Sequence, residues 1–244
     1  MSPSRGEQTH MATARRKKGQ GGQELIEFAL IALLLAVLLI GAFVTGMNLV
    51  RSIQANQACR DLTDMYIHGA DFSTYSMQQL AARLASGLNL QIGSSFAGNE
   101  AANTGNGGNG LVTVTQLMYI GSTTDPSCVA VGANNCTNHD SFVFIQRIQF
   151  GDGALAGQNP SSLGNPSTTA ISSSGIVQNP VTDSGAKLPS AAQSSMQALW
   201  QVSGNGRAPL QDQQICYVVE LYAQSPDLTL GSFSGGGVYA RYFF

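Results

Sequence analysis

An uncharged apolar stretch near the start constrains this chain more than any other feature. Twenty-three consecutive residues, from Phe28 to Val50, carry no charged side chain. As an α-helix that rises ~1.5 Å per residue, they span about 34 Å, which is enough to cross a hydrocarbon core about 30 Å thick. The stretch therefore predicts a transmembrane helix.

The charges on either side of this stretch predict its orientation. Residues 1–22 hold five bases and one acid, a net charge of +4, whereas the remaining residues hold seven bases and thirteen acids, a net charge of −6. Basic residues beside a span stay in the cytoplasm. We expect a single-pass protein with a cytoplasmic N-terminus and an extracytoplasmic body. The formal net charge of −2 and the lack of a basic stripe exclude a strongly basic nucleic-acid binder.

A cleaved secretory signal peptide is the alternative interpretation of the same stretch. Its apolar region is typically ~7–15 residues long and ends in an A-x-A-like site. The run here is longer, and residues 41–46 read Gly-Ala-Phe-Val-Thr-Gly, which is a poor site of that kind. The pattern favours a retained helix.

One carboxylate interrupts the apolar pattern at the head of the segment. Glu27 stands between Ile26 and Phe28, and an acid in a membrane helix costs about 2.5–3.5 kcal/mol at the bilayer centre and less near its edge. It either faces the lipid headgroups or has a specific cationic partner.

The spacing around Glu27 favours a specific partner. If the bond after Gly22 is cut, Gln23 becomes the new N-terminus and Glu27 becomes the fifth residue. A basic leader, a glycine before the cut, a glutamate at the fifth position and an apolar helix together resemble a type IV prepilin signal. The run Glu27-Phe28-Ala29 is most similar to that of the TadE-like pseudopilins of the Tad (tight-adherence) pilus. The resemblance covers mainly residues 15–66.

The resemblance implies a function for these residues. A prepilin peptidase would remove the leader after Gly22, and Glu27, with Phe28 beside it, would serve processing or assembly. The implied partners are membrane lipid, the peptidase, other pilins or pseudopilins and Tad assembly proteins, at the bacterial inner membrane. Cleavage creates an α-ammonium at Gln23, which Glu27 of an adjacent subunit would neutralise in low dielectric, where an unpaired charge is costly.

The helical pattern continues beyond the membrane segment. Apolar residues recur at three- and four-residue steps after Val50, and Gly69 is a suitable stop signal. A second helix is predicted at 76–90, followed by a loop at 93–110. The expected core stripe of the first helix comprises Leu49, Ile53, Ala55, Cys59, Leu62 and Tyr66.

Four strands are predicted after the helices, at 111–120, 141–150, 215–223 and 237–244. In the second of them the aromatic and aliphatic residues at 142, 144, 148 and 150 share one face by period-two alternation. The order predicts an α+β fold in which a transmembrane helix extends into a stalk helix packed on a small antiparallel sheet, as in pilins. The last strand is expected inside the sheet or against the helix.

Residues 151–211 form a polar, low-complexity insertion. They are rich in Ser, Gly, Asn, Gln and Pro, and only 190–202 has helical character. Such a segment predicts a surface loop or partial disorder. The expected organisation is a leader at 1–22, a transmembrane helix at 23–50 and an extracytoplasmic domain at 51–244 that contains this insertion.

The four cysteines suggest disulfides in an oxidising compartment. Cys128 and Cys136 bracket seven residues, and closing that loop would contribute about 2.5 kcal/mol. Cys59 and Cys216 would then pair and tie the sheet to the helix, although four cysteines allow three pairings. A zinc site is disfavoured because no C-x-x-C motif occurs.

No catalytic motif has its required context, and no cofactor is predicted. The G-x-G-x-x-G at 105–110 precedes a strand instead of following one. Residues 231–235 resemble a nucleophile elbow but carry phenylalanine at the nucleophile position, and 71–75 only approach a von Willebrand-type metal motif. His68 and His139 are expected in surface pairs with nearby aspartates.

These observations predict a non-enzymatic minor pseudopilin, since the mature chain far exceeds the short major pilins of that system. The first alternative is a major structural pilin. The second is a signal-anchored extracytoplasmic binding protein or enzyme.

Overall fold

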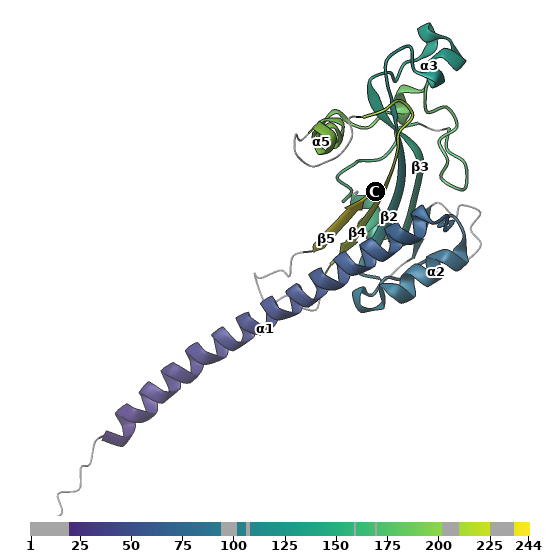
Figure 1. The fold of residues 1–244 in the computed structure, drawn as a ribbon. Helices are drawn as coiled ribbons and strands as arrows, with labels where there is room; N and C mark the ends of the chain where they lie inside the picture. The colour runs from purple at the N-terminus through teal and green to yellow at the C-terminus, as the bar shows by residue number, and fades with distance from the viewer. Residues whose placement is uncertain are drawn as a thin grey trace, which may run out of the picture. The chain divides into compact units, whose positions relative to one another are not determined.

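The computed structural model describes residues 20–93, 102–105, 108–158, 160–168, 170–201, 210–224 and 237–244 (Figure 1). The chain separates into two units, Met1–Thr45 and Gly46–Phe244, which are considered one at a time. Residues 1–19, most of the predicted leader, lie outside the described residues.

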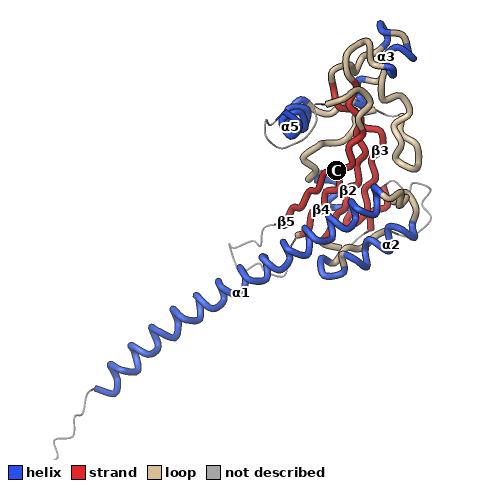
Figure 2. Tube along the Cα trace, in the orientation of Figure 1, coloured by secondary structure: helices blue, strands red, loops and turns tan. Residues whose placement is uncertain are grey.

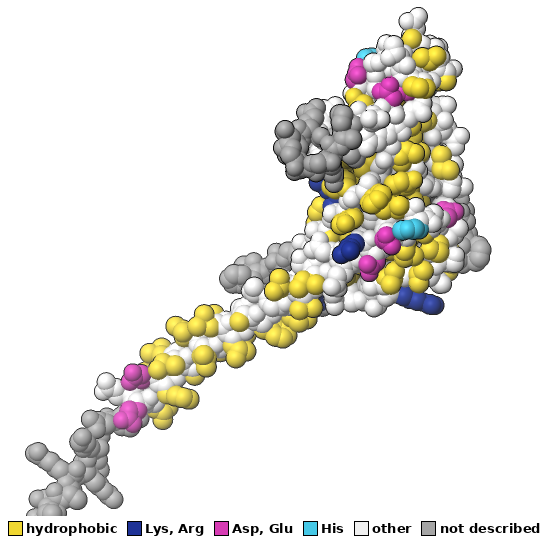
Figure 3. All heavy atoms as spheres, in the orientation of Figure 1, with side chains coloured by type: hydrophobic (Ala, Val, Ile, Leu, Met, Phe, Trp, Pro, Cys, Tyr) yellow, Lys and Arg dark blue, Asp and Glu magenta, His cyan; other side chains and the backbone are white. Residues whose placement is uncertain are grey.

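One long helix, α1, covers Gln20–Ile67. It continues past Val50 as predicted and ends where Gly69 adopts a φ of +89°, a conformation that glycine reaches without strain. Figure 3 shows hydrophobic side chains over the N-terminal part of α1, with acidic side chains at its start. These apolar side chains are exposed in the single chain, as a membrane span requires.

The buried face of α1 in the second unit is narrower than predicted. Ala55, Cys59 and Leu62 are buried, but Leu49 is 62% and Ile53 is 49% exposed. Ile53 precedes Ala55 by two residues, which turns it about 200° around the helix axis. The predicted stripe was therefore wrong for these two residues, which lie away from the core.

The second helix is shorter than predicted. α2 covers Tyr75–Leu84, and the 3₁₀ turn η1 follows at Ser86–Leu88. The chain then reverses at Asn89, whose φ is +50°. Ala81 of α2 lies in the same core cluster as the buried face of α1, so both helices cover one face of the sheet.

The sheet has the strand order β1-β3-β2-β4-β5, and Figure 2 labels the last four of these strands. The strands are β1 (Ala102–Gly105), β2 (Gly110–Ile120), β3 (Ser141–Asp152), β4 (Ile215–Ala223) and β5 (Val238–Phe243). Four of them match the four predicted strands closely. β1 falls in the predicted loop and pairs parallel with β3, so the sheet is mixed and the antiparallel prediction was wrong.

The last strand lies at an edge of this sheet and not inside it. β5 pairs with β4 alone among the described strands. Its Ala240 joins the core cluster that contains the buried residues of α1. Of the two predicted positions, the one against the helix is therefore observed.

A β-bulge in β3 divides its side chains between the two faces of the sheet. The register steps from Gln116↔Gln146 to Leu117↔Phe144, so Ile145 has no partner residue on β2. One extra residue reverses the alternation beyond it. Phe142 and Phe144 thus face away from α1, whereas Ile148 and Phe150 pack with it. The prediction that these four share one face was wrong.

The predicted insertion covers the face of the sheet opposite α1. We call residues 153–201 the cover segment; it contains α4 (Gly153–Gln158), η3 (Ser184–Ala186) and α5 (Ser190–Gln201). Its Leu163, Leu188 and Met196 are buried in one cluster with Phe144 and Val218 of the sheet. The segment is therefore a core layer and not the surface loop that its composition predicted.

Between β2 and β3 the chain forms a small disulfide-closed subdomain with α3 (Pro126–Val131) and η2 (Ala133–Asn135). Asp125 caps α3 by accepting a hydrogen bond from the Ser127 amide. Cys128 packs with Ile120 and Val143 at this end of the hairpin.

Candidate functional site

The sequence-predicted processing residues lie together in the first three turns of α1. Gly22, Gln23, Glu27 and Phe28 are all exposed. Gln23 and Glu27 are four residues apart, so they occupy the same side of the helix about one turn apart. Within the part of the chain that the structure describes, the Glu27 carboxylate has no hydrogen bond or ion pair. It is therefore accessible to a group from outside the chain.

The helix that begins with these residues contains a candidate membrane span. Among the described residues, α1 is the helix that is long and apolar enough to cross a bilayer, and the apolar part is unburied. A signal anchor has the same appearance. The structure thus places Glu27 at the head of a lipid-compatible segment.

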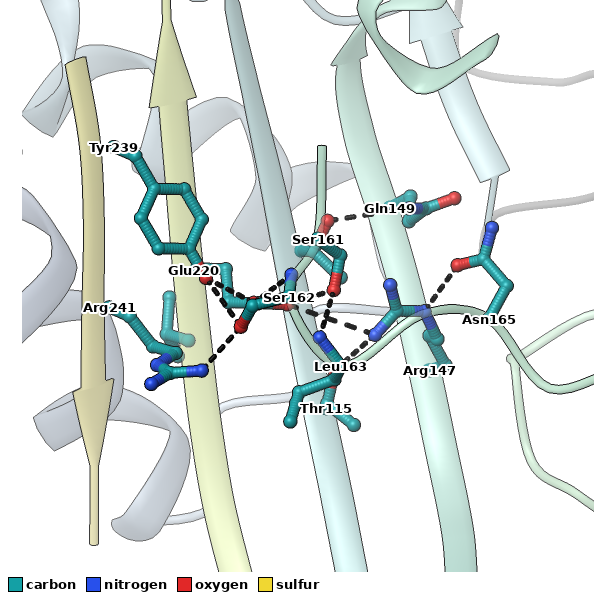
Figure 4. A network of polar contacts seen from close by, with 12 residues as sticks. Thr115, Arg147, Gln149, Ser161, Ser162, Leu163, Asn165, Glu220, Tyr239 and Arg241 are labelled. Carbon is teal, nitrogen blue, oxygen red and sulfur yellow. Dashed lines mark hydrogen bonds and ion pairs between the residues drawn. The ribbon is translucent and has the colours of Figure 1, made fainter. Parts of the chain in front are cut away.

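A buried ion pair lies on the face of the sheet that the cover segment packs against, which we call the cover face, and the sequence pattern did not predict it. Arg147 of β3 and Glu220 of β4 flank β2, with Nη1 and Oε2 3.9 Å apart (Figure 4). Their side chains are 4% and 3% exposed. Both charges stand in the middle of strands that are rich in apolar residues, and charged residues are almost never buried unless paired. That position was a signal from which the pair could have been inferred.

Glu220 connects the cover segment to the sheet. Its Oε1 accepts hydrogen bonds from the amide of Ser162 at 3.1 Å and from its hydroxyl at 3.0 Å. Its Oε2 accepts a hydrogen bond from the Ser161 hydroxyl. On the edge strand, Tyr239 donates to Oε1 and Arg241 donates to the Ser162 hydroxyl oxygen. One carboxylate thereby holds both β5 and the part of the cover segment that follows α4.

Arg147 completes the connection on the other side of β2. Its Nη1 donates to the Thr115 hydroxyl at 2.9 Å, and its Nε donates to Oδ1 of Asn165 at 2.8 Å. Its guanidinium carbon lies 5.5 Å from the centroid of the Phe144 ring. Since Asn165 also belongs to the cover segment, both charges of the pair bind the same layer.

The surroundings change the acidity of two members of this network. Burial lowers the pKa of Arg147 to about 10, and the charge of Glu220 opposes that change. Burial raises the pKa of Tyr239 to about 12, and the negative charge of Glu220 acts in the same direction. At neutral pH Arg147 is charged and Tyr239 keeps its proton, so the network can serve as a fixed tether between layers.

The structure separates the two cysteines that were expected to pair. Cys128 and Cys136 form the predicted local disulfide, with their Cα atoms 5.0 Å apart. The Cys59 thiol instead donates to the carbonyl oxygen of Val219 at 3.0 Å. Cys216, three residues before Val219 on β4, lies on the cover face. The sheet stands between the two thiols, so the predicted Cys59–Cys216 disulfide was wrong.

The other motifs have structural explanations where they can be observed. Asp71 accepts hydrogen bonds from the amide and hydroxyl of Ser73, which is a local turn before α2. His68 lies 3.6 Å from Asp64, and His139 lies 3.0 Å from Asp140, all on the surface. In the described ranges, no group of three or more His, Cys, Asp or Glu side chains is placed to hold a metal ion. Residues 231–235 lie outside the described residues.

No family model, curated protein or solved structure matches this chain.

Proposed function

We propose that this chain is a TadE-like minor pseudopilin, a single-pass, non-enzymatic membrane component of pilus assembly that is processed after Gly22. The N-terminus faces the cytoplasm of a bacterium, the span lies in the inner membrane and the sheet-containing unit lies outside. Other pilins or pseudopilins are its partners in the membrane.

The observation that carries the proposal is the exposed Glu27 carboxylate at the head of the apolar helix, one turn after Gln23. A carboxylate in or beside hydrocarbon requires a cation nearby. Cleavage after Gly22 supplies one as the new α-ammonium, and a neighbouring subunit brings the two charges together. The pairing fixes the axial register of adjacent helices.

The course of α1 beyond the membrane supports the same function. The helix runs without a break from Gln20 to Ile67, and its last turns are part of the core of the second unit. A subunit of this kind carries its extracytoplasmic unit on the same helix that packs against its neighbours.

The decisive experiment compares Gly22→Asp with Gly19→Asp in cells that make the full pilus machinery. Both substitutions add one negative charge to the leader, but only the first removes the glycine before the cut. N-terminal sequencing is expected to find Gln23 first in the wild type and in Gly19→Asp, and a retained leader in Gly22→Asp. A wild-type protein that starts at Met1 would refute the proposal and leave a signal-anchored binding protein or enzyme.

Abundance separates the minor role from the major one. In fibres sheared from the cell surface, a minor pseudopilin is expected at a small fraction of the main subunit. If this chain forms the bulk of the fibre, it is a major pilin with the same chemistry.

A further inference from the structure

The residue that cleavage exposes has a chemistry of its own. An N-terminal glutamine can form a five-membered ring when its α-nitrogen bonds to the Cδ of its own side chain. Asparagine, the other residue with a side-chain amide, would need a four-membered ring. We infer, resting on the proposed cleavage after Gly22, that the Gln23 terminus closes to a pyroglutamyl lactam unless a Glu27 carboxylate holds its amine as ammonium.

The reaction balances without an oxidant or a cofactor. The neutral α-nitrogen of Gln23 attacks its own Cδ, an Nα–Cδ bond forms and the Cδ–Nε2 bond breaks. Nε2 leaves as ammonia with a proton from the α-amine. The chain loses the mass of one ammonia and the positive charge of its terminus.

The surroundings of Gln23 leave room for this ring closure. The Gln23 side chain is exposed on α1. An exposed side chain can turn toward the nitrogen of its own residue. A five-membered ring needs only a rotation of this free side chain.

The helix itself favours the neutral product. After cleavage, an ammonium at Gln23 would be at the N-terminal, positive end of the helix dipole, where cations are unfavourable. It would also lie beside the apolar segment that starts at Phe28, where an unpaired charge is costly. Closure of the lactam removes both costs permanently.

Glu27 opposes the reaction by keeping the nitrogen protonated. An ammonium has no lone pair with which to attack Cδ, so an ion pair blocks the first step. Glu24 is the other acid near this terminus, but as the adjacent residue it points to a different side of the helix. A within-chain pair at an exposed helix end is weak, whereas in low dielectric an ammonium left without the Glu27 carboxylate of a neighbour is costly.

The chemical form of the Gln23 terminus, open or closed, would consequently differ between assembled and unassembled subunits. A subunit that docks early keeps its ammonium, and one that waits in the membrane loses it irreversibly. The lactam cannot pair with Glu27, so a closed subunit is withdrawn from assembly.

Mass spectrometry of the terminal peptide from Gln23 to Arg51 tests this inference. Free amines are blocked by reductive dimethylation at the moment of lysis, so that ring closure during handling is excluded. We expect loss of one ammonia in peptides from the membrane pool, and an open, dimethylated Gln23 in peptides from sheared fibres. In the Glu27→Gln variant, the terminus in the membrane pool should be fully closed, and little of the variant should reach the fibres.

The matched control is Gln23→Asn, which keeps the amide but would need a strained four-membered ring. We expect no loss of ammonia from its amine in either pool. An open Gln23 terminus in every pool, methylated or not, and also in Glu27→Gln would overturn the inference and leave the proposed function standing. A peptide that extends back past Gln23 would instead refute the proposed function itself.

Discussion

Arg147 and Glu220 lie on opposite sides of β2 and share one buried face of the sheet, with their charged atoms 3.9 Å apart. Glu220 accepts hydrogen bonds from Ser161 and Ser162, and Arg147 donates one to Asn165. The cover segment is thus held on the sheet by this charged pair as well as by its buried leucines.

The first prediction concerns the removal of one partner of this pair. Glu220→Ala would leave the guanidinium of Arg147 buried without its counter-charge, which typically costs about 3–5 kcal/mol. Urea unfolding of the full chain in detergent should show that loss. The double variant Arg147→Met with Glu220→Leu removes both charges and should recover most of it. If the single variant unfolds at the wild-type urea concentration, the tether does not stabilise the fold.

A second prediction tests whether the cover segment belongs to the core. Leu163 is fully buried, whereas Ile171 of the same segment is 37% exposed. Leu163→Ala should lower the free energy of unfolding by about 2–4 kcal/mol through lost burial and a cavity. Ile171→Ala is the matched control and should cost clearly less. Equal small effects in denaturant melts would mean that the segment detaches without unfolding the sheet.

The disulfide between Cys128 and Cys136 gives a third prediction. Replacing both residues by alanine opens the small loop that carries α3 and should destabilise the protein by about 2–3 kcal/mol in the chain-entropy description. A reducing agent should lower the melting temperature of the wild type in the same direction. It should leave the melting temperature of the double variant unchanged, and a shift there would point to another bond.

The buried thiol of Cys59 makes stability depend on alkaline pH. Burial raises its pKa from 9.0 to about 12, so the folded state keeps the proton that the unfolded state releases. The contribution of the protonated Cys59 thiol to the free energy of unfolding is complete below pH 9. It declines as the pH rises from 9 toward 12, by roughly 1 kcal/mol per pH unit. The difference in free energy of unfolding between the wild type and Cys59→Ala should therefore become smaller between pH 9 and pH 12. A constant difference would show that the folded thiol ionises normally.

Much of the fold followed from local pattern. The alternation in the strands and the long apolar helix located α1, β2, β3, β4 and β5 closely, because these elements bury side chains at a regular period. The cover segment gave no such period: its large buried residues Leu163, Val177, Leu188 and Met196 stand at irregular intervals of eight or more positions. A layer with so few anchors is recognised only when the sheet face beneath it is known.

The predicted site depended on the same distinction between local and distant contacts. Gly22, Gln23 and Glu27 could be grouped because four or five residues along a helix fix their relative positions. Arg147 and Glu220 are brought together by a strand that neither belongs to, and Cys59 and Cys216 are held apart by that same sheet. Pairings of this kind depend on register and on the bulge at Ile145, which no period reveals.

The bulge at Ile145 divides β3 into two halves whose apolar side chains pack on opposite faces of the sheet. Its first half contributes Phe142 and Phe144 to one layer, and its second half contributes Ile148 and Phe150 to the other. Loss of that single residue would exchange the inner and outer sides of everything before it, so the strand should tolerate several conservative replacements far better than one deletion.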